Sequence, residues 1–212
     1  DTKDLVWRFQ ATNDRFGQAF AEICKKNGYK RPATMAFNNA SGLGNTQGFT
    51  KAWEATGGKV VAHVTYEPNR PSYRSELQKI LDAKPDVIVT GSYLPDTTII
   101  LREWFQSGTP VKWIMPGWAA SPDLVKALGN EVTEGIISVD SVSNEKSKSY
   151  AHYDELYKKA TGKDGSTNVY AAMAYDMGIV LALAIEAAGP GATTAQVNAK
   201  IREVSNPGGT PV

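Results

Sequence analysis

Short apolar runs alternate with longer amphipathic stretches along most of the chain. The apolar runs are rich in β-branched residues and predict strands that are covered on both faces, as in a parallel sheet. They lie at Leu5–Gln10, Ala33–Asn38, Lys59–Glu67, Asp86–Thr90, Val111–Met115 and Gly135–Val139. The stretches between them carry one apolar stripe at helical spacing and predict helices at Asp14–Asn27, Asn45–Thr56, Tyr73–Ala83 and Thr97–Ser107. This alternation predicts a doubly wound α/β fold, with an open parallel sheet and helices on both of its faces.

The pattern changes after Val139, where helical spacing replaces the alternation. Helices are expected at Lys146–Thr161, Asn168–Ala188 and Thr194–Val204. The middle helix is nearly apolar, reading AAMAYDMGIVLALAIEAA, so most of its surface is expected to be covered. No later strand in the sequence is available to cover it, and both ends of the chain look cut. We therefore expect a piece of a longer protein.

Composition narrows the possible partners and leaves the compartment open. The chain has 212 residues, 42% hydrophobic and 21% charged, with a net charge of +1 and scattered Lys and Arg. This argues against nucleic acid or an anionic membrane as a partner. No apolar run is expected to reach the roughly 18 residues needed to cross a bilayer, so no membrane insertion is predicted. No signal peptide is visible. The single cysteine, Cys24, excludes an internal disulfide, and its place on an apolar helix stripe predicts an inert core residue.

The loops that follow the strands are the predicted binding site. In an open parallel sheet, ligands bind beyond the carboxyl ends of the strands. The loops selected by this rule are Asn39–Gly42, Pro68–Arg70, Gly91–Tyr93, Pro116–Trp118 and Asp140–Ser141. Tyr93 and Trp118 place large aromatic rings among small residues, which is typical of a site for a small molecule.

Several stretches, taken in order, resemble the branched-chain amino acid (Leu/Ile/Val) binding family of periplasmic receptors for ABC transporters. They are LVWRFQATNDRFGQAFA, NNASGLGNTQGFTKAWEATGGKVV, YEPNRPSYRSELQKILDAKPDVIVTGSY, TEGIISV and VYAAMAYDMG. The resemblance implies two α/β lobes that close over a ligand. Residues 1–12 would then be a crossover strand from the first lobe, 13–142 the second lobe, and 143–212 helices that return to the first lobe. It also implies a small-molecule ligand, a membrane permease as partner and a periplasmic or extracytoplasmic location. No cofactor, metal or catalytic residue is implied.

The family's binding roles carry over unevenly. Tyr93 occupies the place of a ligand-facing tyrosine, and Tyr170 that of an aromatic wall near the hinge. Leu43 replaces a second tyrosine, and Gly117 replaces an acidic residue that pairs with the ligand's ammonium. A buried ammonium without an anionic partner costs several kcal/mol. Either Asp140 or another group substitutes for that acid, or the ligand is an aromatic or aliphatic organic acid and not an amino acid. The candidate ligand-binding residues are Tyr93, Trp118, Gly117, Ser92, Asn39, Ser41, Asp140 and Tyr170.

Two other functions fit parts of the pattern. Gly42, Gly44 and Gly48 follow a strand and open a helix, as in a dinucleotide-binding enzyme, and Glu67 ends the next strand. Their spacing is one residue too long, and a helix-opening turn is the favoured interpretation. The same two-lobe core also serves as the ligand-sensing part of transcription regulators and receptors.

No enzyme is predicted from the reactive side chains. His63 and His152 have no Cys or acidic ligand at metal spacing, and no nucleophile elbow or Ser/His/Asp set is present.

Overall fold

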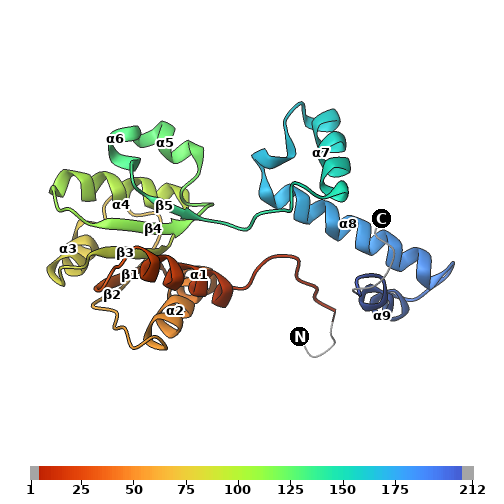
Figure 1. Ribbon diagram of the computed structural model, residues 1–212, viewed down its shortest axis with the longest axis horizontal. Helices are drawn as coiled ribbons and strands as arrows, with labels where there is room; N and C mark the ends of the chain where they lie inside the picture. Colours follow the sequence, from red (N-terminus) through yellow and green to blue (C-terminus); the bar gives the residue numbers. More distant parts are fainter. Residues whose placement is uncertain (1–4, 207–212) are drawn as a thin grey trace. The chain divides into compact units, whose positions relative to one another are not determined.

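The computed structural model describes residues 5–206, which form two compact units (Figure 1). One unit is Thr12–Asp140, and the other combines residues 5–11 with residues 141–206. Each unit has its own architecture, and the two are described separately.

The Thr12–Asp140 unit contains a five-stranded parallel sheet with the order β2-β1-β3-β4-β5. Its strands are β1 (Pro32–Phe37), β2 (His63–Tyr66), β3 (Val87–Gly91), β4 (Lys112–Pro116) and β5 (Ile137–Val139). β1 and β3 are buried along almost their whole length, which explains why they read as unbroken apolar runs. The chain passes from β1 outward to β2 and then returns to the other side of β1. The strand order therefore reverses between β1 and β3, which is the topological switch point of a doubly wound fold.

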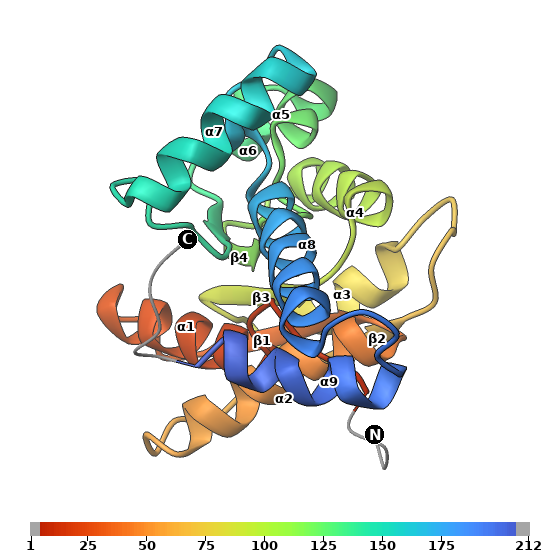
Figure 2. The same ribbon diagram turned by 90° about the vertical axis from the view of Figure 1, so that its right-hand side faces the viewer.

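Helices cover both faces of this sheet (Figures 1 and 2). On one face, α1 (Asn13–Lys26) and α2 (Ala40–Glu54) enclose a core of Phe16, Phe20, Ala21, Cys24, Phe49, Trp53, Val87, Val89 and Ile114. The other face is covered by α3 (Arg74–Asp82), α4 (Leu94–Ser107), α5 (Pro122–Leu128) and α6 (Asn130–Thr133). Its core includes Met35, Tyr66, Tyr73, Leu77, Ile80, Ile88, Leu101, Trp113, Met115 and Leu124. Cys24 is fully buried, as expected of an inert core residue.

The second unit is helical in its described residues. It consists of α7 (Lys148–Thr161), the short 3₁₀ turn η1 (Gly165–Thr167), α8 (Val169–Ala188) and α9 (Thr194–Val204). Side-chain caps open each of the longer helices, from Ser147, Asn168 and Thr193. α9 packs on α8. The segment before the first unit also belongs here, because Trp7 Nε1 donates to Asn198 Oδ1 at 2.7 Å.

Helix α8 corrects the expectation about apolar runs. By length and composition it could cross a membrane, and 11% of its most apolar window is buried. A single helix of this kind is weak evidence for a membrane span, since core helices of soluble proteins pass the same test. Ala172 and Ala184 are its buried residues, whereas Met177, Leu181 and Ile185 are exposed. We expected most of the surface of this apolar helix to be covered by other parts of the protein. Within the described residues, most of it is not.

The predicted strand at Leu5–Gln10 is wrong. Residues 5–12 form no regular secondary structure, and a strand needs a neighbouring strand to complete its hydrogen bonds. Other differences concern boundaries: β2 is shorter than Lys59–Glu67, and α2 and α4 each begin a few residues before the predicted start. The short helices α5 and α6 were not predicted, because neither has room for a helical period of apolar residues.

Candidate functional site

The loops that follow the five strands form one edge of the sheet, which we call the carboxyl edge. They are residues 38–39, 67–73, 92–93, 117–121 and 140. At the switch point two of them are held close together by glycine. A Cβ on Gly91, the last residue of β3, would lie 2.2 Å from the carbonyl oxygen of Gly42 in α2. Backbone therefore packs on backbone here, and the first turn of α2 is fixed against the end of β3.

Asn39 opens helix α2, and its side chain is used in doing so. The Asn39 Oδ1 atom accepts a hydrogen bond from the backbone N–H of Gly42 at 2.7 Å, which is an N-cap. Ser41 lies half-buried in the first turn of the same helix. Asn39 thus fixes the direction of α2 at the switch point, and Ser41 is the partly exposed hydroxyl beside it.

Tyr93 and Trp118, the two predicted aromatic residues, both lie at the carboxyl edge. Tyr93 immediately precedes α4 and is 36% exposed, with its ring edge-on to Phe37 at a centroid distance of 5.2 Å. Trp118 follows β4 and is half-buried, with its ring edge-on to Phe16 at 5.3 Å. The indole N–H of Trp118 donates to the carbonyl oxygen of Ser92 at 3.0 Å. Because Ser92 directly precedes Tyr93, the two rings are linked through one residue.

Ser92 itself is buried and is not placed to contact a ligand with its side chain. It is 2% exposed, and its hydroxyl lies within hydrogen-bonding distance of the hydroxyls of Tyr66 and Thr97. Ser92 was a candidate ligand-binding residue, but its hydroxyl hydrogen-bonds inside the core. Its carbonyl accepts the indole N–H of Trp118.

Gly117 and Asp140 meet at the β4–β5 end of the edge. A Cβ on Gly117 would lie 2.1 Å from Asp140 Oδ2, so the carboxylate occupies the space that any side chain at residue 117 would need. The backbone N–H of Gly117 donates to the Val139 carbonyl at 2.8 Å and keeps the two chain segments in register. Because Gly117 has no side chain, the carboxylate of Asp140 can lie directly against its backbone.

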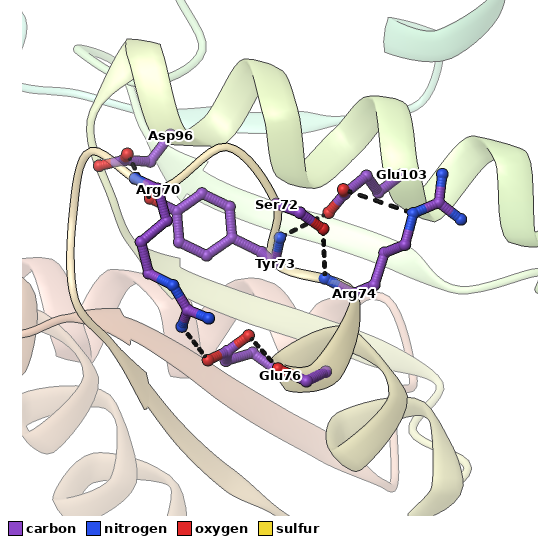
Figure 3. Close-up of polar contacts among 8 residues, drawn as sticks. Arg70, Ser72, Tyr73, Arg74, Glu76, Asp96 and Glu103 are labelled. Carbon is purple, nitrogen blue, oxygen red and sulfur yellow. Dashed lines mark hydrogen bonds and ion pairs between the residues drawn. The ribbon is translucent and has the colours of Figure 1, made fainter.

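Carboxylates from α4 fasten the loop between β2 and α3, and Figure 3 shows this cluster. Asp96 is 4% exposed, and its Oδ1 accepts from the backbone N–H of Asn69 at 3.1 Å and from the Tyr73 hydroxyl at 2.6 Å. Burial, together with the hydrogen bond to Asp96, raises the pKa of Tyr73 to about 12, so its hydroxyl keeps its proton. Asn69 has a left-handed backbone with φ of 58°, which asparagine tolerates. The loop is therefore held in one conformation.

A second carboxylate of α4 acts on the start of α3 (Figure 3). Glu103 Oε2 accepts from the backbone N–H of Tyr73 at 2.7 Å, and its Oε1 lies 3.5 Å from Arg74 Nε. Arg70 pairs with Glu76 and lies over the Tyr73 ring. Sequence reasoning missed Asp96 and Glu103, because acidic residues on an amphipathic helix ordinarily face solvent. No local signal distinguishes them from solvated residues.

The comparisons with known proteins agree with this geometry. A family profile described as periplasmic binding protein matches residues 1–210. The chain belongs to this family. No curated protein matches the chain. Among solved structures, the leucine binding protein LivK of Thermotoga maritima is 25% identical, with a TM-score of 0.78, over 90% of this chain and 54% of that one. A solute binding protein of R. palustris in complex with benzoate is 23% identical, with a TM-score of 0.76, over 92% and 54%.

A type 1 periplasmic binding protein from Bordetella pertussis is 20% identical, with a TM-score of 0.79, over 90% of this chain and 54% of that one. The chain thus spans little more than half the length of these structures. The predicted family and the type I periplasmic-binding-protein fold are confirmed. Members of the family bind small ligands as solute-binding proteins of ABC transporters.

In this periplasmic binding protein, protein atoms occupy the space beside the glycines that imitate a dinucleotide motif. A Cβ on Gly44 would lie 2.2 Å from Asn13 Nδ2, and one on Gly48 would lie 2.9 Å from the Asn13 carbonyl oxygen. The glycines therefore let α1 and α2 approach closely, and they leave no open cradle for a phosphate. Nor does any group of three or more His, Cys, Asp or Glu within residues 5–206 offer a metal site. A hollow of about 460 Å³ lined by Lys51, His63 and neighbours shares no residue with the carboxyl edge.

Tyr170 belongs to the other unit of the structure. It lies half-buried in the first turn of α8, where its backbone N–H donates to Asn168 Oδ1 at 3.0 Å. Its predicted role near the hinge stays a prediction. The described geometry thus brings together Tyr93, Trp118, Gly117, Asp140, Asn39 and Ser41 at one edge, with Ser92 beneath them.

Proposed function

We propose that this chain is the greater part of one ligand-binding lobe, with helices of its partner lobe, in the substrate receptor of an ABC transporter. The receptor captures a small molecule by hinge closure outside the cytoplasm and presents the closed form to a membrane permease. It performs no covalent chemistry. The observation that carries this proposal is the pair of rings, Tyr93 and Trp118, held at the switch-point edge of a family member's sheet.

The division into lobes follows the two compact units. Thr12–Asp140 corresponds closely to the predicted second lobe at 13–142. Residues 5–11 contact α9, as expected if residues 1–12 and 143–212 belong to the first lobe. The exposed apolar residues Met177, Leu181 and Ile185 of α8 would be covered by the remainder of that lobe. The related structures, nearly twice as long, have the chain length for such a cover.

Asp140 favours a ligand with an ammonium group. Its carboxylate is seated on Gly117, one residue before Trp118, so the chain places an anion beside the residue that precedes an aromatic ring. A positively charged group that enters the closed cleft needs such an anion, since burial of an unpaired charge costs several kcal/mol. A carboxylate turned toward the same position would be repelled. We therefore infer that the ligand is an amino acid or another amine with an apolar side chain, in preference to an organic acid such as benzoate.

The two-lobe proposal is tested by thermal shift. This chain and a version that contains both complete lobes would be screened against the same amino acids and organic acids. We expect a ligand to raise the melting temperature clearly in the two-lobe protein only, because half of the cleft is missing from the shorter chain. Equal and tight binding by both proteins would contradict the role of hinge closure.

The ligand class is tested by NMR on the 212-residue chain at millimolar ligand. L-leucine and 4-methylpentanoate share a carbon skeleton and differ by the ammonium. We expect L-leucine to move the indole signal of Trp118 more than 4-methylpentanoate does. Asp140→Asn and Gly117→Ala should both remove this preference, the first by removing the charge and the second by displacing it. Asp82→Asn, an exposed carboxylate of α3, is the matched control. A preference that survives both variants, or one for 4-methylpentanoate in the unmodified chain, would refute the ammonium proposal.

A further inference from the structure

Three buried hydroxyl groups and one carbonyl form a chain beneath the carboxyl edge. The Tyr66 hydroxyl lies 2.5 Å from Ser92 Oγ, and the Thr97 hydroxyl lies 2.8 Å from both Ser92 Oγ and the Tyr93 carbonyl oxygen. We call these groups the Ser92 cluster: the hydroxyls of Tyr66, Ser92 and Thr97 with the carbonyl of Tyr93. Each of the three hydroxyl-bearing residues is 2% exposed. Water therefore does not substitute for a lost partner without entering the core.

Counting protons gives the cluster a direction. It holds three hydroxyl protons, and the Tyr93 carbonyl is the member that can only accept. Every proton has an acceptor if each hydroxyl donates toward that carbonyl, and Tyr66 is then the first donor. Burial raises the pKa of Tyr66 well above its ordinary value, so the phenol keeps its proton and remains a donor at neutral pH.

The cluster is connected to both aromatic rings of the edge, Tyr93 and Trp118. The carbonyl of Ser92 accepts the indole N–H of Trp118, and the residue after Ser92 is Tyr93. Tyr66 also reaches Tyr93 through Phe37, which is edge-on to each of them, at 6.1 Å from Tyr66 and 5.2 Å from Tyr93. A shift of Ser92 would therefore move the Tyr93 backbone and the Trp118 acceptor together.

We propose that Tyr66 is a positioning residue for ligand binding, which acts through Ser92 to hold the Tyr93 and Trp118 rings in one relative arrangement. The ligand-binding part of this inference rests on the proposed function, whereas the coupling of the two rings does not. Tyr66 is no ligand contact: it lies in the core, in edge-on contact with Phe37 and Tyr73.

The test uses Tyr66→Phe in the whole chain and needs no ligand. Solvent exchange of indole N–H groups is followed by NMR. The indole of Trp118 reports the edge, and that of Trp104, which donates to the Thr109 carbonyl at 2.8 Å in the same unit, is the internal reference. We expect Trp118 to exchange about tenfold faster in Tyr66→Phe, while Trp104 is unchanged. Thr97→Val should act in the same direction, and Thr97→Ser, which keeps the hydroxyl, should restore the original rate.

A purely structural role for Tyr66 gives a different result. Lower stability alone would speed exchange at Trp104 and Trp118 by the same factor, and that outcome would overturn the proposal. Unchanged exchange at both indoles would overturn it as well. In a second arm, L-leucine and benzoate are titrated into the version that contains both complete lobes, and Tyr66→Phe in that version should weaken whichever binds by about five- to tenfold. If neither probe binds the unmodified two-lobe protein, the proposed function fails, and the exchange ratio still decides whether Tyr66 couples the rings.

Discussion

Replacement of Gly91 by alanine tests the contact that fixes the switch point. A Cβ at this position would lie 2.2 Å from the carbonyl oxygen and 2.8 Å from the Cα of Gly42, whereas ordinary contact begins near 3.4 Å. Helix α2 and strand β3 would have to separate by about 1 Å, and neither partner is a side chain that could rotate away. Overpacking of this kind costs about 1–3 kcal/mol. Alanine recovers up to about 1 kcal/mol that glycine loses in a strand. Because both clashing partners are backbone atoms, the upper end of this range applies, and the net loss should be about 2 kcal/mol.

Urea unfolding followed by tryptophan fluorescence measures this loss. Four of the five tryptophans, Trp53, Trp104, Trp113 and Trp118, lie in the Thr12–Asp140 unit, so most of the signal follows that unit. With a denaturant slope of about 2 kcal/mol per M, Gly91→Ala should lower the midpoint by about 1 M. Gly178→Ala is the control: it makes the same change in α8, where a Cβ meets nothing within 4 Å, and it should leave this transition unchanged. A Gly91→Ala midpoint within about 0.2 M of the original would refute the argument from close backbone contact.

Three further predictions concern the same unit. Burial raises the pKa of Cys24 to about 12, so a thiol reagent at pH 8 should modify the folded chain at least about 1,000-fold more slowly than the urea-unfolded chain; equal rates would show that the thiol is accessible. Asn39→Ala should lower the free energy of unfolding by about 1 kcal/mol in the same urea assay, because it removes the side chain that accepts the Gly42 N–H. Asn39→Asp keeps an oxygen at this position and should retain most of the stability. Burial opposes the charged form of Glu76, but hydrogen bonds from neighbouring side chains, Arg70 among them, outweigh it and lower its pKa. Its charge therefore stabilises the fold above the unfolded-state pKa of about 4.3, and the deficit of Glu76→Gln measured at pH 7 should shrink as the pH falls below about 4.

Strands with two covered faces were predictable, and positions that depend on distant partners were not. β1, β3 and β4 read as apolar runs because helices lie on both sides of them. Leu5–Gln10 gives the same local signal and forms no strand, since pairing depends on a neighbour that the local sequence does not reveal. Helix α4 begins before its first apolar stripe residue, with Pro95 in its first turn, which is a start signal that the stripe alone conceals.

The edge was predictable from topology, but the roles within it were not. The rule that ligands bind beyond the carboxyl ends of parallel strands selects the loops of Tyr93 and Trp118 from the sequence alone. The same rule selected Ser92, whose hydroxyl the structure turns inward to Tyr66. Alternation along a strand predicts which face of the sheet a side chain lies on, but it makes no prediction for residues beyond the end of the strand. Only the contacts could show that the Ser92 hydroxyl is turned inward and that its carbonyl accepts the Trp118 indole N–H.

The positions of the rings depend on glycines, which have no Cβ, as well as on the side chains that contact the rings. Gly91 and Gly42 have no Cβ where β3 meets α2, and Gly117 has none where the Asp140 carboxylate lies. A relative that kept Tyr93 but carried alanine at residue 91 would hold the tyrosine backbone in another position. It would then present the same ring to a different volume. The glycines beside the rings therefore help to set where each ring lies, and a change at any of them should alter ligand binding even where both rings are kept.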